Sequence, residues 1–168
     1  MSLMNILQFP DPRLKKVAVP VDTFDQELWT LIDSMFETMY EAYGCGLAAI
    51  QVNVQKQVIV IDVSEKYTHP LCLVNPEILS TEETTSSDEG CLSFPGVHAK
   101  GVKRAKNIKV RFYDRLGKIQ ELATSGLLAI CIQHEIDHLK GVTFYDHLSP
   151  LKQDMLMKAL IKIRRRAL

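Results

Sequence analysis

Residues 133–138 read Gln133-His134-Glu135-Ile136-Asp137-His138, an H-E-x-x-H pattern at the end of an apolar segment. On an α-helix, successive side chains turn by about 100° and rise by about 1.5 Å. The imidazoles of His134 and His138 would therefore lie one turn apart on one face, where both can bind one metal ion. From its place about 100° around the helix, the Glu135 carboxylate can reach the open side of that ion. The pattern predicts a catalytic metal centre.

A solvated helix that carries two histidines and two acids is the alternative interpretation. The preceding residues 127–132, Leu-Leu-Ala-Ile-Cys-Ile, argue against it, because a surface helix needs a polar face. We therefore expect a buried central helix. Thr124 or Ser125 is suited to cap its start, and Gly141 fits its end.

Length and charge limit the possible functions. The 168 residues are enough for one domain with a sizeable core, and we predict a single domain over 1–168 that includes a C-terminal helix at 149–168. The 20 basic and 20 acidic residues balance, so no overall field attracts DNA or a membrane. Basic residues cluster between 100 and 111 and again at the chain end; we interpret both clusters as ordinary solvated surface, with a dedicated site for an anionic partner as the alternative.

The cysteines and the N-terminus indicate the compartment. Residues 1–5 lack the basic flank and apolar run of a secretory signal, and no run of about 18 apolar residues could span a membrane. The four cysteines are too irregularly spaced for a secreted disulfide framework. We expect a cytoplasmic protein with reduced thiols and no membrane association.

The N-terminal half predicts an arm, a helix and two strands. Residues 1–21 contain three prolines and predict an extended arm. Thr23 and Gln26 form a capping box for an amphipathic helix that stops before Gly44. Strands are predicted at 57–63 and at 71–75, the second ending at Pro76. The polar residues 80–88 suit a loop or a strand with little core.

The C-terminal half predicts a hairpin and two helices. Residues 108–112 alternate between apolar and polar, 114–117 form a turn, and 118–122 return. Ser149 followed by Pro150 starts the last helix. The predicted fold class is α+β, with short, mostly antiparallel strands packed around the central metal-binding helix and with N-terminal and C-terminal helices.

A catalytic centre of this type needs a third protein ligand and one open position. The candidates are Cys131, Cys91, Cys45, His147, His98, His69 and remote carboxylates. Cys131 and His138 differ by a rise of about 10.5 Å, whereas two metal–ligand bonds span less than about 4.5 Å, so Cys131 cannot join both histidines. His147 lacks the spacing of a metzincin ligand. Cys91, in a glycine-containing turn, is the strongest candidate; a buried structural cysteine is the alternative.

Three segments together resemble a known family. Gly44–Gln51 (GCGLAAIQ), Glu89–Ser93 (EGCLS) and Gln133–His138 (QHEIDH) resemble, in order and spacing, the three motifs of peptide deformylases. The resemblance extends over nearly the whole chain. It implies hydrolysis of the formyl group from the N-terminal formyl-methionine of newly made polypeptides, with release of formate. A general zinc-dependent peptidase of the H-E-x-x-H class is the alternative.

The resemblance implies a metal centre with three ligands: Cys91, His134 and His138. The implied ion is Fe²⁺, although Zn²⁺, Ni²⁺ or Co²⁺ also suit such a donor set. A water activated by the ion attacks the formyl carbon, since a bound ion lowers the pKa of water. Arg104 and Glu89 match positions that the family pairs as an ion pair behind the cysteine turn.

The resemblance also assigns the remaining catalytic roles. Glu135 is the general base and then the general acid. The Gln51 side chain and the Leu92 backbone N–H stabilise the oxyanion. The implied partners are N-formylmethionyl peptides or nascent chains, and the basic stretch 158–166 suggests a ribosome contact.

A substrate pocket follows from the same resemblance, lined by Gly44, Cys45, Gly46, Leu127, Ile130 and Cys131, together with His134. Cys45 and Ser87 stand where relatives commonly carry aliphatic residues, which predicts a roomier and less apolar mouth. His98 stands where relatives often have Arg or Tyr, and its role stays open.

Overall fold

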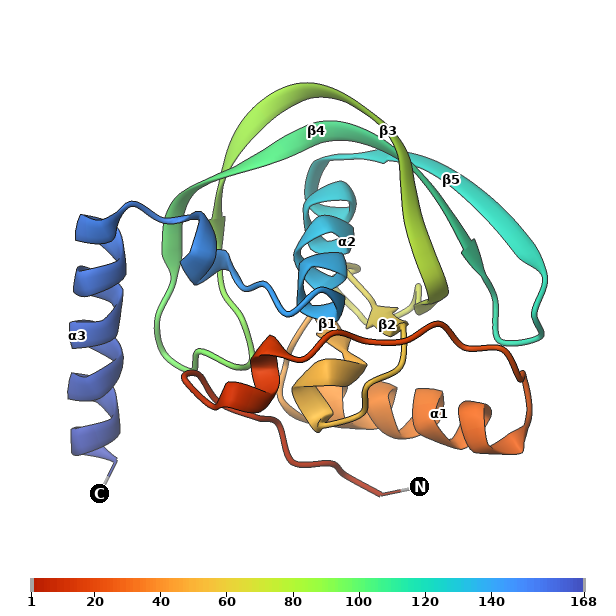
Figure 1. Ribbon diagram of the computed structural model, residues 1–168, viewed down its shortest axis with the longest axis horizontal. Helices are drawn as coiled ribbons and strands as arrows, with labels where there is room; N and C mark the ends of the chain where they lie inside the picture. Colours follow the sequence, from red (N-terminus) through yellow and green to blue (C-terminus); the bar gives the residue numbers. More distant parts are fainter. Residues whose placement is uncertain (1, 168) are drawn as a thin grey trace.

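The computed structural model describes residues 2–167 and has the predicted α+β architecture. At its centre lies α2 (Gly126–Leu139), over which the longer strands of a five-stranded antiparallel sheet arch (Figure 1). The sheet order β1-β2-β3-β4-β5 follows the chain. Its strands are β1 Gly46–Ala48, β2 Val58–Ile61, β3 Leu71–Glu89, β4 Ala99–Tyr113 and β5 Ile119–Ser125.

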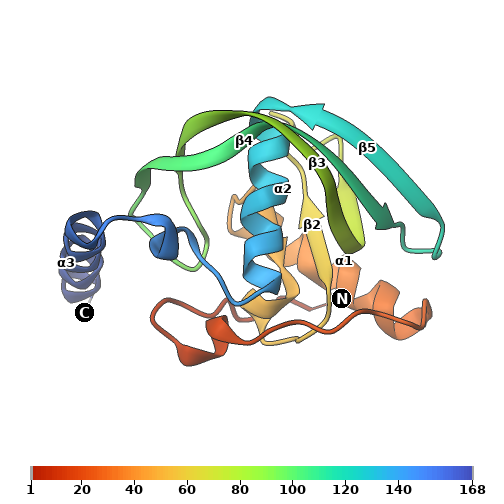
Figure 2. The same cartoon turned by 45° about the horizontal axis from the view of Figure 1, so that its top comes forward.

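Two more helices flank this centre. Helix α1 (Gln26–Glu41) packs on the side of β2 away from α2, and α3 (Pro150–Arg166) stands at the edge of the molecule (Figure 2). Short 3-10 helices occur at Pro12–Lys15, Ala49–Val52 and Phe144–His147. Within the described residues, no helix has both the length and the apolar character needed to cross a bilayer. The single-domain prediction for 1–168 stays a prediction.

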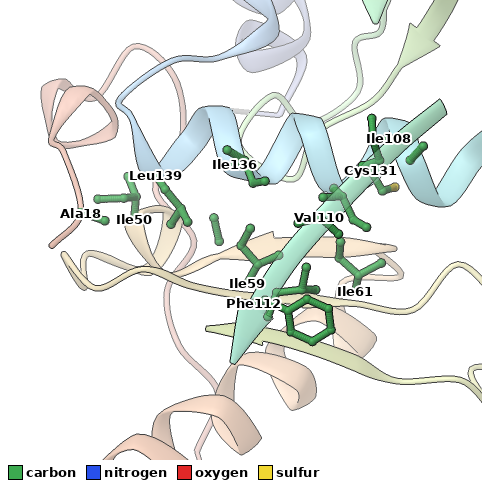
Figure 3. Packing of buried hydrophobic residues seen from close by; sticks show 14 residues of the cluster. Ala18, Ile50, Ile59, Ile61, Ile108, Val110, Phe112, Cys131, Ile136 and Leu139 are labelled. Carbon is green, nitrogen blue, oxygen red and sulfur yellow. The ribbon is translucent and has the colours of Figure 1, made fainter. Parts of the chain in front are cut away.

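Strand β2 explains why two layers of helix form. Its four residues are all fully buried, as expected for a strand covered on both faces. Because side chains alternate along a strand, Ile59 and Ile61 pack toward α2 while Val58 and Val60 pack toward α1. Figure 3 shows Ile136 and Leu139 of α2 facing the isoleucines of β2 and the Val110 region of β4. This apolar layer fixes the orientation of the central helix.

Helix α1 does not start where the sequence pattern predicts. The predicted capping box of Thr23 and Gln26 is wrong, because the N-cap is Asp25, whose carboxylate accepts a hydrogen bond from Leu28 N at 3.2 Å. The Thr23 hydroxyl instead donates to Asp22 at 3.2 Å. A carboxylate at the N-cap is equally suited to the free N–H groups of the first turn.

Strand β3 does not end at Pro76 but runs for 19 residues, from Leu71 to Glu89. The register with β4 shifts between Val74 and Glu77, and Asn75 has φ of 52°. Such a bulge lets a proline stand in a strand, because its missing N–H falls outside the ladder. The Asn75 side chain bonds both backbone groups of Val21, at 2.7 and 2.8 Å, and so anchors the N-terminal arm there.

Candidate metal centre

Helix α2 carries the two histidines on its buried side. Ser125 is its N-cap, without a side-chain hydrogen bond, and Gly141 follows its end with φ of 75°. His134 is 7% exposed and His138 is fully buried, and their ring centroids lie 5.0 Å apart. The pair is therefore presented one turn apart, away from water.

The turn after β3 brings Cys91 to the same place. Cys91 Sγ lies 3.4 Å from His138 Nε2, although the two residues are 47 positions apart. Phe94 N donates to Cys91 O at 2.9 Å, and the Phe94 ring packs between Phe9 and Phe144, at centroid distances of 4.6 and 4.5 Å. This aromatic cluster anchors the turn to the N-terminal arm and to the 3-10 helix Phe144–His147. One ligand atom each from Cys91, His134 and His138 lies within 4.8 Å of the other two.

A buried ion pair stands behind His134. Glu89 Oε1 lies 2.9 Å from His134 Nδ1, and both Glu89 oxygens accept hydrogen bonds from Arg104 at 2.8 Å. Burial by itself would raise the pKa of Glu89, but hydrogen bonds from Arg104 and His134 hold that pKa well below its usual range. Arg104 also donates to Asp137 at 2.6 Å, and Asp137 accepts from His147 at 2.8 Å. Arg104 is only 5% exposed, so the interpretation of its basic cluster as solvated surface is wrong for this residue.

Glu135 points into the space beside the histidines. Its Oε2 lies 4.0 Å from His134 Nε2, and burial raises the pKa of its carboxyl to about 7, opposed by the His134 charge. A Cβ added to Gly46 would stand 2.6 Å from Glu135 Oε2. Residue 46 must therefore be glycine for the carboxylate to keep this position.

The Gln51 side chain also lies beside Cys91. It lies in the 3-10 helix after β1, is 1% exposed, and its Oε1 accepts from Ala48 N at 2.9 Å. Its Nε2 donates to Ser93 Oγ at 3.0 Å and lies 3.6 Å from Cys91 Sγ. The amide is thus oriented by its oxygen, with its nitrogen directed toward Ser93 and Cys91.

The residues present fit a divalent metal ion. One sulfur and two imidazoles form a donor set typical of catalytic zinc or iron sites. The second nitrogen of His134 is held by a carboxylate, the usual support of a metal-binding histidine. Among the described residues, Glu135 Oε1 is buried without a hydrogen-bond partner, so the pocket has a polar atom available to a water or substrate. Burial lowers the pKa of His138 well below its ordinary value, which favours the neutral ring that a metal requires.

Comparison with known proteins decides the family. The family model described as polypeptide deformylase matches residues 3–154. The chain belongs to this family. It is 54% identical over 168 residues to peptide deformylase 2 of Xanthomonas campestris, covering 98% of both chains. Its fold is similar to a peptide deformylase of Legionella pneumophila, with a TM-score of 0.95, 47% identity, and coverage of 99% of this chain and 98% of that one.

A structure of the Ehrlichia chaffeensis peptide deformylase, solved in complex with actinonin, also matches. Its TM-score is 0.91 at 38% identity, covering 98% of this chain and 99% of that one. The chain is thus a hydrolase of the deformylase class, the class that removes formyl groups from newly made polypeptides.

The deformylase motifs surround one cavity of about 470 Å³. Its lining includes the predicted pocket residues Gly44, Cys45, Gly46, Leu127, Ile130 and Cys131, and also Cys91, Leu92, His134 and Glu135. Ser87 is not among the lining residues, and its hydroxyl donates to Glu89 Oε2 at 2.5 Å; its predicted effect on the mouth stays a prediction. His98 does line the cavity, with its ring against Gly90.

Sequence reasoning missed several residues of this deformylase site. Ser93, the last residue of the second motif, accepts a hydrogen bond from the Gln51 amide, a contact that its residue type does not predict. Tyr43, 88% exposed, and Val97 line the cavity. The order of the motifs gave no signal for these contacts, since each depends on how distant segments meet.

Proposed function

We propose that Cys91, His134 and His138 bind one divalent ion, next to which the formyl group of N-formylmethionyl peptides is hydrolysed. The observation that carries this proposal is the convergence of the three ligand atoms beside the buried Glu135 carboxylate in one cavity. When bound, such an ion supplies Lewis acidity that makes water nucleophilic near neutral pH. Proton transfer, oxyanion stabilisation and substrate binding are assigned to the residues around it.

Glu135 is assigned the proton transfers. Its carboxylate takes the proton of the attacking water and returns it to the amine nitrogen that leaves. Support comes from its burial at 4% exposure and from Oε1, which has no hydrogen-bond partner among the described residues. A base that is already engaged by another side chain would be less available to water.

Gln51 and Leu92 are assigned the oxyanion. The Gln51 amide is fixed through its oxygen on Ala48 N, so its Nε2 is oriented before substrate arrives. The backbone N–H of Leu92 follows directly on the proposed ligand Cys91 in the same turn. Two donors from different segments would meet the developing charge from two sides.

The small formyl group and the methionine side chain are assigned to different walls of the cavity. Gly46 keeps the chain close to Glu135, which leaves little room for an acyl group larger than formyl. The methionine side chain is assigned to Gly44, Cys45, Leu127, Ile130 and Cys131, all of which line the cavity. Their mostly apolar surfaces suit a thioether.

The proposed native ion is Fe²⁺. Metal analysis of protein purified without oxygen, paired with a formate-release assay, tests the ion and the activity together. One equivalent of iron and rapid release of formate are expected. Glu135→Gln is expected to retain the metal but to release formate about 10²- to 10⁴-fold more slowly, whereas the exposed Glu77→Gln should match wild type. Equal rates in Glu135→Gln and wild type would contradict the assignment of the base.

A general zinc peptidase is the competing function. It would cleave internal bonds of peptides that carry no formyl group. Presenting one peptide in formylated and unformylated forms separates the two, because only a peptidase produces new internal ends from both. Formate from the formylated form alone supports the deformylase assignment.

We propose a cytoplasmic location and a ribosome contact through α3. All four thiols are free, as in a reducing compartment. Lys158, Lys162, Arg165 and Arg166 are exposed on α3 and could meet ribosomal RNA near emerging chains. Ribosome binding should weaken with salt and in Lys162→Glu/Arg166→Glu. A ribosome affinity that changes neither with salt nor with these substitutions would count against this contact.

A further inference from the structure

Two thiols meet in the wall of the cavity, from segments far apart in the chain. Cys45 Sγ and Cys131 Sγ lie 3.3 Å apart although 86 positions separate the residues. Cys131 lies on α2, is 8% exposed, and packs in the core cluster (Figure 3). Cys45 lies between the end of α1 and the start of β1 and is exposed. Cys45 is thus the exposed residue of the pair and Cys131 the buried one.

We propose that Cys45 and Cys131 form a reversible disulfide when the protein meets a peroxide, a modification site separate from the proposed metal ligands. A disulfide bond is about 2.05 Å long, so the sulfurs need to approach by only about 1.3 Å. The connecting segment between α1 and β1 can supply this movement, since Cys45 lies in no helix or strand and is flanked by Gly44 and Gly46. Cys131 is held in its helix and need not move.

The chemistry uses one peroxide molecule for each bond. The exposed Cys45 sulfur attacks one peroxide oxygen, so an S–O bond forms, the O–O bond breaks, and water leaves with the thiol proton. Cys131 sulfur then attacks the Cys45 sulfenic acid, the S–O bond breaks, and a second water leaves with the Cys131 proton. Two thiols are oxidised by two electrons and the peroxide is reduced to two waters. A dithiol reductant reverses the bond.

Cys91 is the competing partner, since it lines the same cavity. Its sulfur already lies 3.4 Å from His138 Nε2 and 3.6 Å from Gln51 Nε2. The Cys131 sulfur, by contrast, lies in contact with the Cys45 sulfur at 3.3 Å. We therefore expect Cys45 to form its disulfide with Cys131 and not with Cys91.

The bond should alter the pocket, a consequence that rests on the proposed function. Both sulfurs line the cavity assigned to the methionine side chain, and residue 45 adjoins Gly46, which touches Glu135. Movement of Cys45 toward α2 would narrow the cavity on this side and would shift Gly46. We expect a fall of about tenfold in kcat/KM for formyl-methionyl peptides, the scale by which a misfitted apolar pocket discriminates.

Mass spectrometry tests the bond independently of activity. Nickel-loaded protein is treated with equimolar hydrogen peroxide, blocked with iodoacetamide and digested with trypsin. Cleavage after lysine puts Cys45 in peptide 17–56, Cys131 in peptide 119–140, and both Cys72 and Cys91 in peptide 67–100. The expected product links 17–56 to 119–140, lacks two hydrogen atoms, and separates with dithiothreitol.

Matched variants complete the test. Cys45→Ser and Cys131→Ser should abolish the link, and each should keep more of its own untreated activity than wild type does after peroxide. Cys72→Ser, which replaces a cysteine outside the cavity lining, should form the link and lose activity like wild type.

A link from 17–56 to 67–100, or oxidation of Cys45 to sulfinic acid without any link, would overturn the proposal. If the disulfide forms and kcat/KM is unchanged, the proposed effect of the disulfide on the substrate pocket is refuted. Absence of formate release before treatment would instead refute the proposed function and leave the link to be judged by mass.

Discussion

Glu89 Oε1 lies 2.9 Å from His134 Nδ1, which ties the end of β3 to the middle of α2. The same carboxylate is held by Arg104 of β4, so three segments converge behind one imidazole. This contact orients the ring and leaves Nε2 directed toward Glu135 and the proposed ion. It gives the first prediction.

Glu89→Gln should lower the affinity for zinc by about 10- to 100-fold, because a neutral amide orients and polarises the imidazole less well. Competition with a chromophoric chelator measures the affinity. Glu77→Gln is the matched control, since Glu77 pairs with Arg111 at 3.0 Å on the surface. An unchanged zinc affinity in folded Glu89→Gln would refute the role of this contact.

Arg104→Met should destabilise the protein by about 3–5 kcal/mol, because it leaves the buried Glu89 charge without its partner. Urea unfolding of the metal-free protein measures the change without interference from metal binding. Arg111→Met removes an exposed ion pair and should change stability by less than about 1 kcal/mol. Similar losses in both variants would show that burial of the pair is unimportant.

Gly46→Ala should reduce formate release by about 100-fold, since the new Cβ would stand 2.6 Å from Glu135 Oε2 and displace the base. Thermal unfolding separates this clash from general damage. The loss of stability caused by Gly46→Ala should shrink when residue 135 is also changed by Glu135→Ala. If the two changes are simply additive, the carboxylate is not what the added methyl group strikes.

Cys45→Ile should sharpen the preference for formyl-methionyl over formyl-norleucyl peptides. Cys45 lines the cavity, and isoleucine would fill space that the smaller thiol leaves to either unbranched side chain. The ratio of the two kcat/KM values measures the preference in wild type and variant. An identical ratio would show that residue 45 does not shape this pocket.

The iron-loaded protein should lose activity rapidly in air, and the nickel-loaded protein should keep it. A thiolate beside ferrous iron is open to oxidation by oxygen, whereas nickel does not promote this step as readily. Formate release is followed over time in air and under nitrogen for both forms. Equal lifetimes in air would contradict the prediction.

Local patterns determined much of this protein. The spacing of His134, Glu135 and His138 sets their directions on a helix before any packing is known, because helical geometry is local. The alternation at 108–112 and the turn before β5 were equally readable, although β4 already begins at Ala99. The rise along α2 also excluded Cys131 from sharing an ion with both histidines, and Cys131 instead packs in the core.

Other features depended on contacts between distant segments. Proline normally ends a central strand, yet β3 passes Pro76 because its ladder with β4 tolerates a bulge there. Asp25 rather than Thr23 caps α1, a choice between two suitable residues that the pattern could not make. Local propensity is a weak guide wherever a neighbouring strand supplies the hydrogen bonds.

By itself, the sequence determined the chemistry: two imidazoles and a carboxylate on one helix, with a cysteine in a turn as the best third ligand. Only the tertiary structure placed Cys91 3.4 Å from His138, Glu89 against His134, and Cys45 3.3 Å from Cys131. These pairs are 47, 45 and 86 positions apart. No local periodicity encodes such distances, since they result from the burial of α2 beneath the arch of β3 and β4.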